Sequence, residues 1–283
     1  MIQPDTNRFN SIVVLDSIPD GELNTARRLR EDLESYASAY APSPAIVYVR
    51  VPGRVELFDV LDECARRATE EDLAPLLHIE CHGDEDGFQL ADGSVVDWLE
   101  LKPALTSVNI AMQLNLMVIV AACTGGSLAK AVSVTERAPL WGLIGPTKAI
   151  SPNALEAAYG ALYRELLCSK SPSKAVQALD AIAEPGMFWR ATAQGLFEAA
   201  WRLYRQERCT PEMLRDRSLR LQDELLQRTG KAIPPESIVK ALLEREPHSF
   251  DRFCKTFFMH DLYPSHAERF NVPYVALASP HVG

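Results

Sequence analysis

The stretch Leu116-Met-Val-Ile-Val-Ala-Ala-Cys-Thr-Gly-Gly126 decides the fold of this 283-residue chain. Its apolar, β-branched run is followed by two alanines, a cysteine and a Gly-Gly turn. This pattern predicts a strand buried on both faces, as in a parallel sheet. Cys123 then falls at the carboxyl end of the strand, where ligands bind in open α/β sheets. The cysteine is therefore the first candidate for chemistry in this sequence.

A second stretch, Pro75-Leu-Leu-His-Ile-Glu-Cys-His-Gly83, has the same design. It predicts a buried strand that ends at His82-Gly83 and is followed by the polar loop Asp84-Glu-Asp-Gly87. One helix-length segment separates this strand from the cysteine strand, as a right-handed crossover between parallel neighbours requires. We therefore expect His82 and Cys123 to lie at the same edge of one sheet.

The rest of the chain alternates strands with helices up to about residue 150. We expect further strands over 10–16, 45–51 and 140–145, and helices after a cap at Asp20, over 55–71 and over 98–115. Asp92-Gly93 predicts a hairpin over 88–95. From Ser151 onward the sequence predicts only helices, over about 153–169, 173–183, 187–207, 211–229, 235–245 and 249–259. The expected fold is α/β, a mostly parallel sheet with helices on both faces, followed by a helical C-terminal region.

Composition limits the kinds of partner. The net charge of −9 argues against non-specific binding to nucleic acid and against docking on an anionic membrane. The N-terminus has no apolar stretch typical of a signal peptide, and no apolar run approaches the roughly 20 residues needed to span a bilayer. The six cysteines are scattered without a CxxC pair, which suits reduced thiols. We therefore expect a cytoplasmic protein.

A histidine beside a cysteine indicates nucleophilic catalysis. A thiol attacks a carbonyl as the thiolate, and a nearby imidazole promotes its formation. His82 would act as general base and then acid, and Cys123 as the nucleophile. The main-chain N–H groups of Gly83 and Cys123 would stabilise the developing oxyanion. The alternative interpretation of each side chain alone is structural: a buried thiol and a satisfied core histidine.

Other chemistries fit the residues less well. A nucleophile elbow needs glycine two residues before the nucleophile, where this chain has Ala121. A metal site from His78, Cys81, His82 and Cys123 is conceivable. However, alternation along a strand sends Cys81 to the face opposite the two histidines. We therefore expect neither metal nor cofactor.

These residues resemble the caspase-like cysteine peptidases, in particular their bacterial CHAT-type branch. The matching motifs are His82-Gly83, Ala121-Ala-Cys-Thr-Gly-Gly126, Leu143-Ile-Gly-Pro146 and the helical start at Ser151-Pro-Asn-Ala-Leu-Glu-Ala-Ala-Tyr-Gly-Ala-Leu-Tyr163. The resemblance covers about residues 10 to 185. It implies a caspase-hemoglobinase fold for a core of residues 1–185 and a His–Cys dyad that needs no metal. The helical extension 186–283 matches nothing in that family.

The resemblance also implies a function. It predicts a cysteine endopeptidase that cleaves a partner protein at a defined site in prokaryotic defence or regulated cell death, after activation by a partner or by processing. The competing hypothesis is a catalytically silent or auto-inhibited adaptor that acts through its helical region. A third hypothesis is another thiol-dependent hydrolase or an acyltransferase on small molecules.

Two residues bear on substrate preference. Family members that prefer a basic residue before the scissile bond often carry Asp where this chain has Ala121, which favours an apolar or small residue instead. Asp16 falls where caspases contribute a pocket residue, so it could pair with a substrate Lys or Arg. Its alternative role is as a turn residue that caps the next helix. The acidic loop 84–86 could bind calcium or a basic substrate, or be simply solvated.

Overall fold

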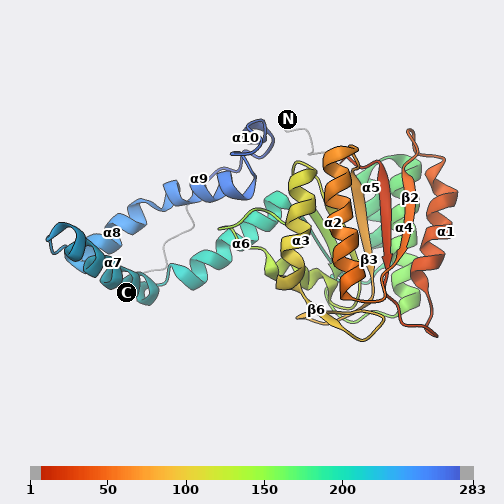
Figure 1. Cartoon of the computed structure of the whole chain (residues 1–283), viewed down its shortest axis with the longest axis horizontal. Coiled ribbons are helices and arrows are strands. Elements are labelled where there is room, and N and C mark those ends of the chain that lie inside the picture. Colours follow the sequence, from red (N-terminus) through yellow and green to blue (C-terminus); the bar gives the residue numbers. More distant parts are fainter. Residues whose placement is uncertain (1–7, 275–283) are drawn as a thin grey trace. The chain divides into compact units, whose positions relative to one another are not determined.

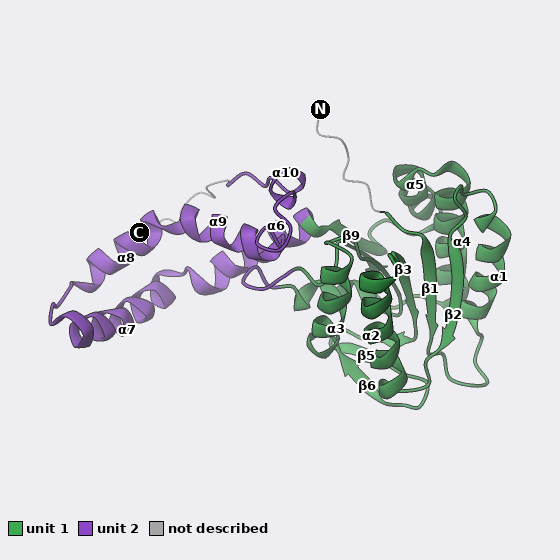
Figure 2. Ribbon diagram, turned by 45° about the horizontal axis from the view of Figure 1, so that its top comes forward, with its two compact units in different colours: residues 1–132, 138–193 green, residues 133–137, 194–283 purple. Residues whose placement is uncertain are grey.

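The structure is a computed structural model that describes residues 8–274. It divides into two compact units, shown in Figure 2. The first unit contains the residues up to 132 together with 138–193. The second contains 133–137 together with the residues from 194 onward.

A six-stranded sheet forms the centre of the first unit, with the strand order β2-β1-β3-β7-β8-β9 (Figure 1). The strands are β1 (Ser11–Asp16), β2 (Ala45–Arg50), β3 (Pro75–Glu80), β7 (Met117–Ala121), β8 (Gly142–Pro146) and β9 (Phe188–Thr192). The first five strands run parallel to one another, and the edge strand β9 is antiparallel to β8. The predicted α/β class with a mostly parallel sheet is confirmed.

Helices cover both faces of the sheet, which explains why its inner strands are mostly apolar. On one face, α1 (Thr25–Ala37), α4 (Pro152–Ser169) and α5 (Pro172–Ile182) pack against every second strand residue, including Val14 and Ile119. On the other lie α2 (Arg54–Glu70) and α3 (Trp98–Ala111), as Figure 1 shows. The short helix η1 (Gly125–Ala131) follows β7.

A second, three-stranded sheet lies between β3 and α3 in the sequence. It consists of β4 (His82–Gly83), β5 (Gly87–Gln89) and β6 (Val95–Asp97), paired antiparallel. Gly93 adopts φ +87°, the left-handed conformation that the predicted Asp92-Gly93 turn requires. The hairpin is therefore confirmed, and His82 lies on a strand of its own beside it.

The prediction of helix alone after Ser151 was wrong at β9. Residues Phe188–Thr192 form an edge strand along β8, and helix α6 begins only at Ala193. The exposed edge of β8 needs a hydrogen-bonding partner, and this short aromatic run supplies it while burying Phe188. Because β9 belongs to the first unit, the division falls after Ala193.

The start of the first helix also differs from the prediction. Its N-cap is Asn24, whose side-chain oxygen accepts from the Arg27 N–H, and not Asp20. Asp20 forms an ion pair with Arg50 at 3.0 Å instead. Leu23 precedes the helix and is 40% exposed. A loop of residues 17–24 therefore links β1 to α1.

The second unit is helical, as predicted. It contains α6 (Ala193–Arg208), α7 (Pro211–Thr229), α8 (Pro235–Glu244), α9 (Glu246–Phe257) and α10 (His266–Arg269). Aromatic side chains hold it together: Phe197 and Trp201 contact Phe250, and Phe197 also contacts Phe257 and Phe258. Among residues 8–274, no helix combines the length and apolar character needed to cross a membrane.

Candidate functional site

The ends of β3 and β7 lie side by side, as the sequence predicts. Glu80 is in register with Ala121, and the Cys81 N–H donates to the Ala121 carbonyl oxygen at 3.4 Å. Just beyond, Gly83 approaches the cysteine turn so closely that an added Cβ would lie 2.8 Å from the Cys123 carbonyl oxygen. The histidine segment and the cysteine segment are therefore in direct contact.

Replacing Gly83 by alanine tests this contact. The added methyl group would also lie 2.9 Å from the Ala122 Cβ, so β4 or the cysteine turn must move. We expect Gly83→Ala to lower the free energy of unfolding by about 1–3 kcal/mol, the usual cost of overpacking. Urea denaturation measures this. Gly93→Ala has open space around the new Cβ and suffers only its positive φ, so it should be milder. Equal effects of the two variants would contradict the close approach.

Cys123 lies in the turn after β7 and is half-buried. Its thiol donates to the main-chain oxygen of Ile150 at 3.8 Å. The next residue, Thr124, has φ 53°, and the turn continues into η1 through Gly125, where any Cβ would meet Val120 at 2.6 Å. Within residues 8–274 the main-chain N–H of Cys123 donates to no protein oxygen. It is therefore available to a ligand, as an oxyanion-hole donor must be.

His82 is about half exposed, so it is not the satisfied core histidine of the alternative interpretation. Its Nε2 lies 2.8 Å from the Glu22 carboxylate in the β1–α1 loop. In the described part of the chain, no hydrogen bond joins His82 to Cys123, whose thiol contacts Ile150 instead. The main chains of the two segments are therefore in contact, but the His82 and Cys123 side chains are not hydrogen-bonded to each other.

The remaining thiols are in settings that differ from that of Cys123. Burial raises the pKa of the Cys64 thiol to about 11, and burial beside Glu80 raises that of Cys81 still further. Both therefore stay protonated and unreactive near neutral pH. Cys168 is exposed on α4 and gives a natural reference thiol.

Asp16 is fully buried and surrounded by donors. Its carboxylate accepts from the Ile18 N–H (2.9 Å), Asn24 Nδ2 (2.8 Å) and the Tyr48 hydroxyl (2.5 Å), and it pairs with Arg50 at 3.0 Å. These partners favour its structural role, as the turn residue that holds the cap of α1, over contact with a substrate. Ala121 is 2% exposed at the end of β7.

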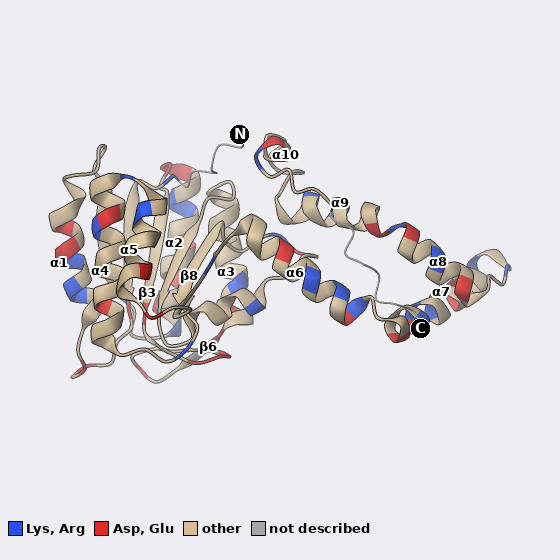
Figure 3. Ribbon diagram, turned by 180° about the vertical axis from the view of Figure 1, so that it is seen from behind, with Lys and Arg blue, Asp and Glu red and all other residues tan. Residues whose placement is uncertain are grey.

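The acidic loop is held by internal contacts. Asp84 accepts from the main-chain N–H groups of Asp86 and Gly87, which closes the turn, and Glu85 pairs with Lys130 at 3.1 Å. Figure 3 shows acidic segments in the loops near β6. No group of three or more His, Cys, Asp or Glu side chains in residues 8–274 is placed to hold a metal ion.

His78, one of the conceivable metal ligands, belongs to the core. Its Nδ1 is 3.1 Å from the Tyr163 hydroxyl of α4, and its Nε2 is 3.9 Å from the Glu80 carboxylate. The ring is inaccessible to solvent. The structure therefore separates His78, buried in the six-stranded sheet, from His82, on β4 of the three-stranded sheet.

Sequence reasoning missed two groups that contact the candidate residues: the Glu22 carboxylate and the Ile150 carbonyl. Both lie in loops, one after β1 and one before α4. Neither loop carries a motif, because a single glutamate and a main-chain oxygen leave no pattern in a sequence.

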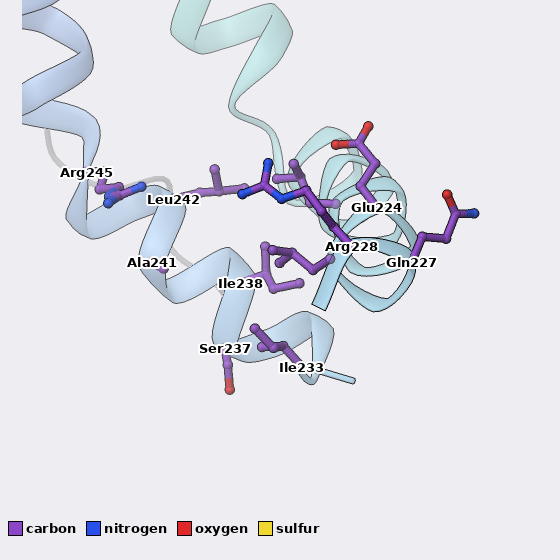
Figure 4. A pocket seen from close by; sticks show the side chains of 11 residues that line it. Glu224, Gln227, Arg228, Ile233, Ser237, Ile238, Ala241, Leu242 and Arg245 are labelled. Carbon is purple, nitrogen blue, oxygen red and sulfur yellow. The ribbon is translucent and has the colours of Figure 1, made fainter. Parts of the chain in front are cut away.

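A pocket also lies in the second unit, between α7 and α8 (Figure 4). Its lining is largely apolar and includes Leu221, Leu225, Ile233, Ile238 and Leu242. Polar side chains at its border include Glu224 and Arg228. Its lining contains no cysteine or histidine, so it offers no groups for thiol chemistry.

Comparison with known proteins gives no assignment: no protein-family model matches the sequence, and a search of curated proteins finds no match. The class is therefore defined by the fold alone, an α/β protein with a six-stranded, mostly parallel sheet and a helical C-terminal region. The caspase-like resemblance stays a prediction from the sequence motifs.

Proposed function

We propose that this protein is a cysteine endopeptidase of caspase-like type, with Cys123 as nucleophile and His82 as general base and acid. The observation that supports this most directly is the contact between the two strand ends, with Gly83 against the Cys123 carbonyl oxygen. The contact brings the segment that carries the His82 imidazole against the turn that carries the half-buried Cys123 thiol, whose main-chain N–H donates to no oxygen of the described residues. These are the three parts that acyl transfer to a thiol requires.

The proposed reaction follows from these groups. His82 takes the Cys123 proton, and the thiolate attacks the carbonyl carbon of a peptide bond. The N–H groups of Gly83 and Cys123 donate to the resulting oxyanion. The imidazolium then gives its proton to the departing amine, which leaves a thioester on Cys123. A water molecule, deprotonated by His82, hydrolyses the thioester and releases the acid product.

An auto-inhibited state is the second candidate, and one observation favours it. The Cys123 thiol donates to Ile150 and the His82 imidazole contacts Glu22, so the dyad is not joined in this structure. An activating partner protein or a processing step would join it, and the helical unit with its α7–α8 pocket is a candidate surface for such a partner. A silent adaptor would keep the fold without ever joining the dyad.

Alkylation of the thiols tests whether the dyad can be joined. We expect iodoacetamide at pH 7 to modify Cys123 faster than exposed Cys168, because His82 would take the proton of the Cys123 thiol as it attacks. His82→Ala should lower the Cys123 rate by roughly ten-fold and leave Cys168 unchanged. Mass spectrometry of tryptic peptides follows each thiol. The buried Cys64 should react only as the pH rises toward its raised pKa of about 11.

The opposite result is equally informative. If Cys123 reacts no faster than Cys168, and His82→Ala changes nothing, the isolated chain has no working dyad. The auto-inhibited and adaptor hypotheses then remain, and repeating the labelling with candidate partner proteins separates them. Only the auto-inhibited enzyme gains Cys123 reactivity when its partner binds.

A further inference from the structure

The carboxylate of Glu22 contacts the histidine of the candidate site, and no sequence motif indicates it. Its Oε2 lies 2.8 Å from Nε2 of His82. Glu22 belongs to the loop of residues 17–24, which leaves β1 next to β3 because those strands are paired. The Ser17 N–H donates to the Glu80 carbonyl oxygen at 2.8 Å, so the loop starts directly beside the histidine segment.

This loop is fixed at both ends. The buried Asp16 carboxylate accepts from Ile18 at the start of the loop and from the Asn24 side chain at its end. Within the loop, the Glu22 N–H donates to the Pro19 carbonyl oxygen at 3.3 Å. The position of Glu22 is therefore determined by buried and paired groups, although the side chain itself is half exposed.

The contact determines how the imidazole can act. An ionised carboxylate only accepts hydrogen bonds, so Nε2 of His82 must be the protonated nitrogen that donates to Glu22. In a neutral imidazole the other nitrogen, Nδ1, then carries the lone pair. Nδ1 is consequently the only atom of His82 that can accept a proton from Cys123 while this contact holds.

We infer that Glu22 is a positioning residue for His82, holding the ring in the tautomer whose Nδ1 serves as the base toward Cys123. The inference rests on the proposed function, because it assigns an orienting group to the proposed base. Glu22 contacts Nε2 of His82 and leaves Nδ1 for Cys123, so orienting group, base and nucleophile would act in the order used by unrelated hydrolases.

The competing interpretation is that Glu22 and His82 form a surface ion pair with no further effect. Both side chains are about half exposed, 52% for His82 and 48% for Glu22, and such pairs contribute little to stability. The two interpretations differ in their consequences. A plain ion pair affects neither the tautomer of His82 nor the reactivity of Cys123, whereas a positioning residue affects both.

The test compares three variants of the full chain. Glu22→Ala removes the acceptor, Glu22→Gln keeps an acceptor oxygen without the charge, and Asp20→Ala removes a neighbouring loop carboxylate that does not contact His82. We expect Glu22→Ala to lower the rate of Cys123 alkylation at pH 7 by roughly ten-fold. Glu22→Gln should recover part of that loss, and Asp20→Ala should keep the wild-type rate.

Nitrogen-15 NMR of His82 supplies a second readout that does not depend on activity. The wild type should show Nε2 protonated and Nδ1 unprotonated at a pH where the ring is neutral, and Glu22→Ala should show a mixture of the two tautomers. An unchanged tautomer together with an unchanged alkylation rate would overturn the inference. A faster alkylation in Glu22→Ala would also overturn it, because Glu22 would then restrain His82 away from Cys123.

The two proposals fail in different ways. If wild-type Cys123 reacts no faster than Cys168, the proposed function loses its support, whatever the variants do. If wild-type Cys123 is fast and depends on His82 but not on Glu22, the proposed function stands and the positioning role alone is rejected.

Discussion

Replacing Cys123 by alanine is expected to abolish peptide-bond cleavage, with at least a 10³-fold loss of rate. The turn that carries Cys123 contacts the histidine segment, and removing one member of a catalytic pair removes most of what the pair contributes. The measurement is mass spectrometry of new N-termini in a proteome incubated with wild type or variant. Cleavage sites should appear with wild type alone.

The matched control is Cys168→Ala, which removes an exposed thiol of α4 and should cleave like the wild type. Cys123→Ala removes only one sulfur atom from a half-buried turn, so the variant should unfold at the same urea concentration as the wild type. Cleavage that survives in folded Cys123→Ala would reject Cys123 as the nucleophile. Cleavage by neither protein would point to the auto-inhibited or adaptor hypothesis, and the assay would be repeated with a partner present.

Replacing Asp16 by alanine is expected to give the largest loss of stability, about 3 kcal/mol in the free energy of unfolding. The change leaves Arg50 without its buried partner and removes the acceptor of Ile18, Asn24 and the Tyr48 hydroxyl. Arg50 is 34% exposed and can turn toward water, which keeps the loss at the lower end of the range for buried pairs. Urea denaturation measures it.

Asp20→Ala is the matched control, because Asp20 also pairs with Arg50 but is fully exposed. It should leave the urea midpoint unchanged. The same experiment separates the two roles considered for Asp16. A structural Asp16 lowers stability when changed to Ala, whereas a substrate-binding Asp16 would leave stability intact in Asp16→Asn and weaken only the cleavage of sites with Lys or Arg before the scissile bond.

Much of the fold could be predicted because its strands follow simple patterns. The runs that became β3 and β7 are mostly apolar and almost entirely buried, since a sheet covered on both faces offers no solvent-facing positions. Glycine at position 93 predicted its hairpin for an equally local reason, the positive φ of the turn. The later helices were predicted from their period, and α7 has the predicted bounds, Pro211–Thr229.

The errors fell where a distant segment decided the outcome. Phe188–Thr192 is a strand because it pairs with the open edge of β8. The local sequence of the segment does not predict this pairing. Asn24 caps α1 in place of Asp20 because the buried carboxylate of Asp16 holds the Asn24 side chain. In both cases a contact made only in the folded chain outweighed local preference.

The sequence by itself determined the alternation of strands and helices, and hence that His82 and Cys123 each follow one of two neighbouring strands, β3 and β7. Parallel strands joined by crossover helices must bring their carboxyl ends to one edge, so this placement needs no knowledge of side-chain contacts. The tertiary structure alone decided which groups the two side chains touch. Glu22 reaches His82, and Ile150 reaches Cys123, through loops whose paths depend on buried ion pairs and packing between segments far apart in the chain. Such contacts have no period and no motif, because loops follow the surface that the rest of the fold provides.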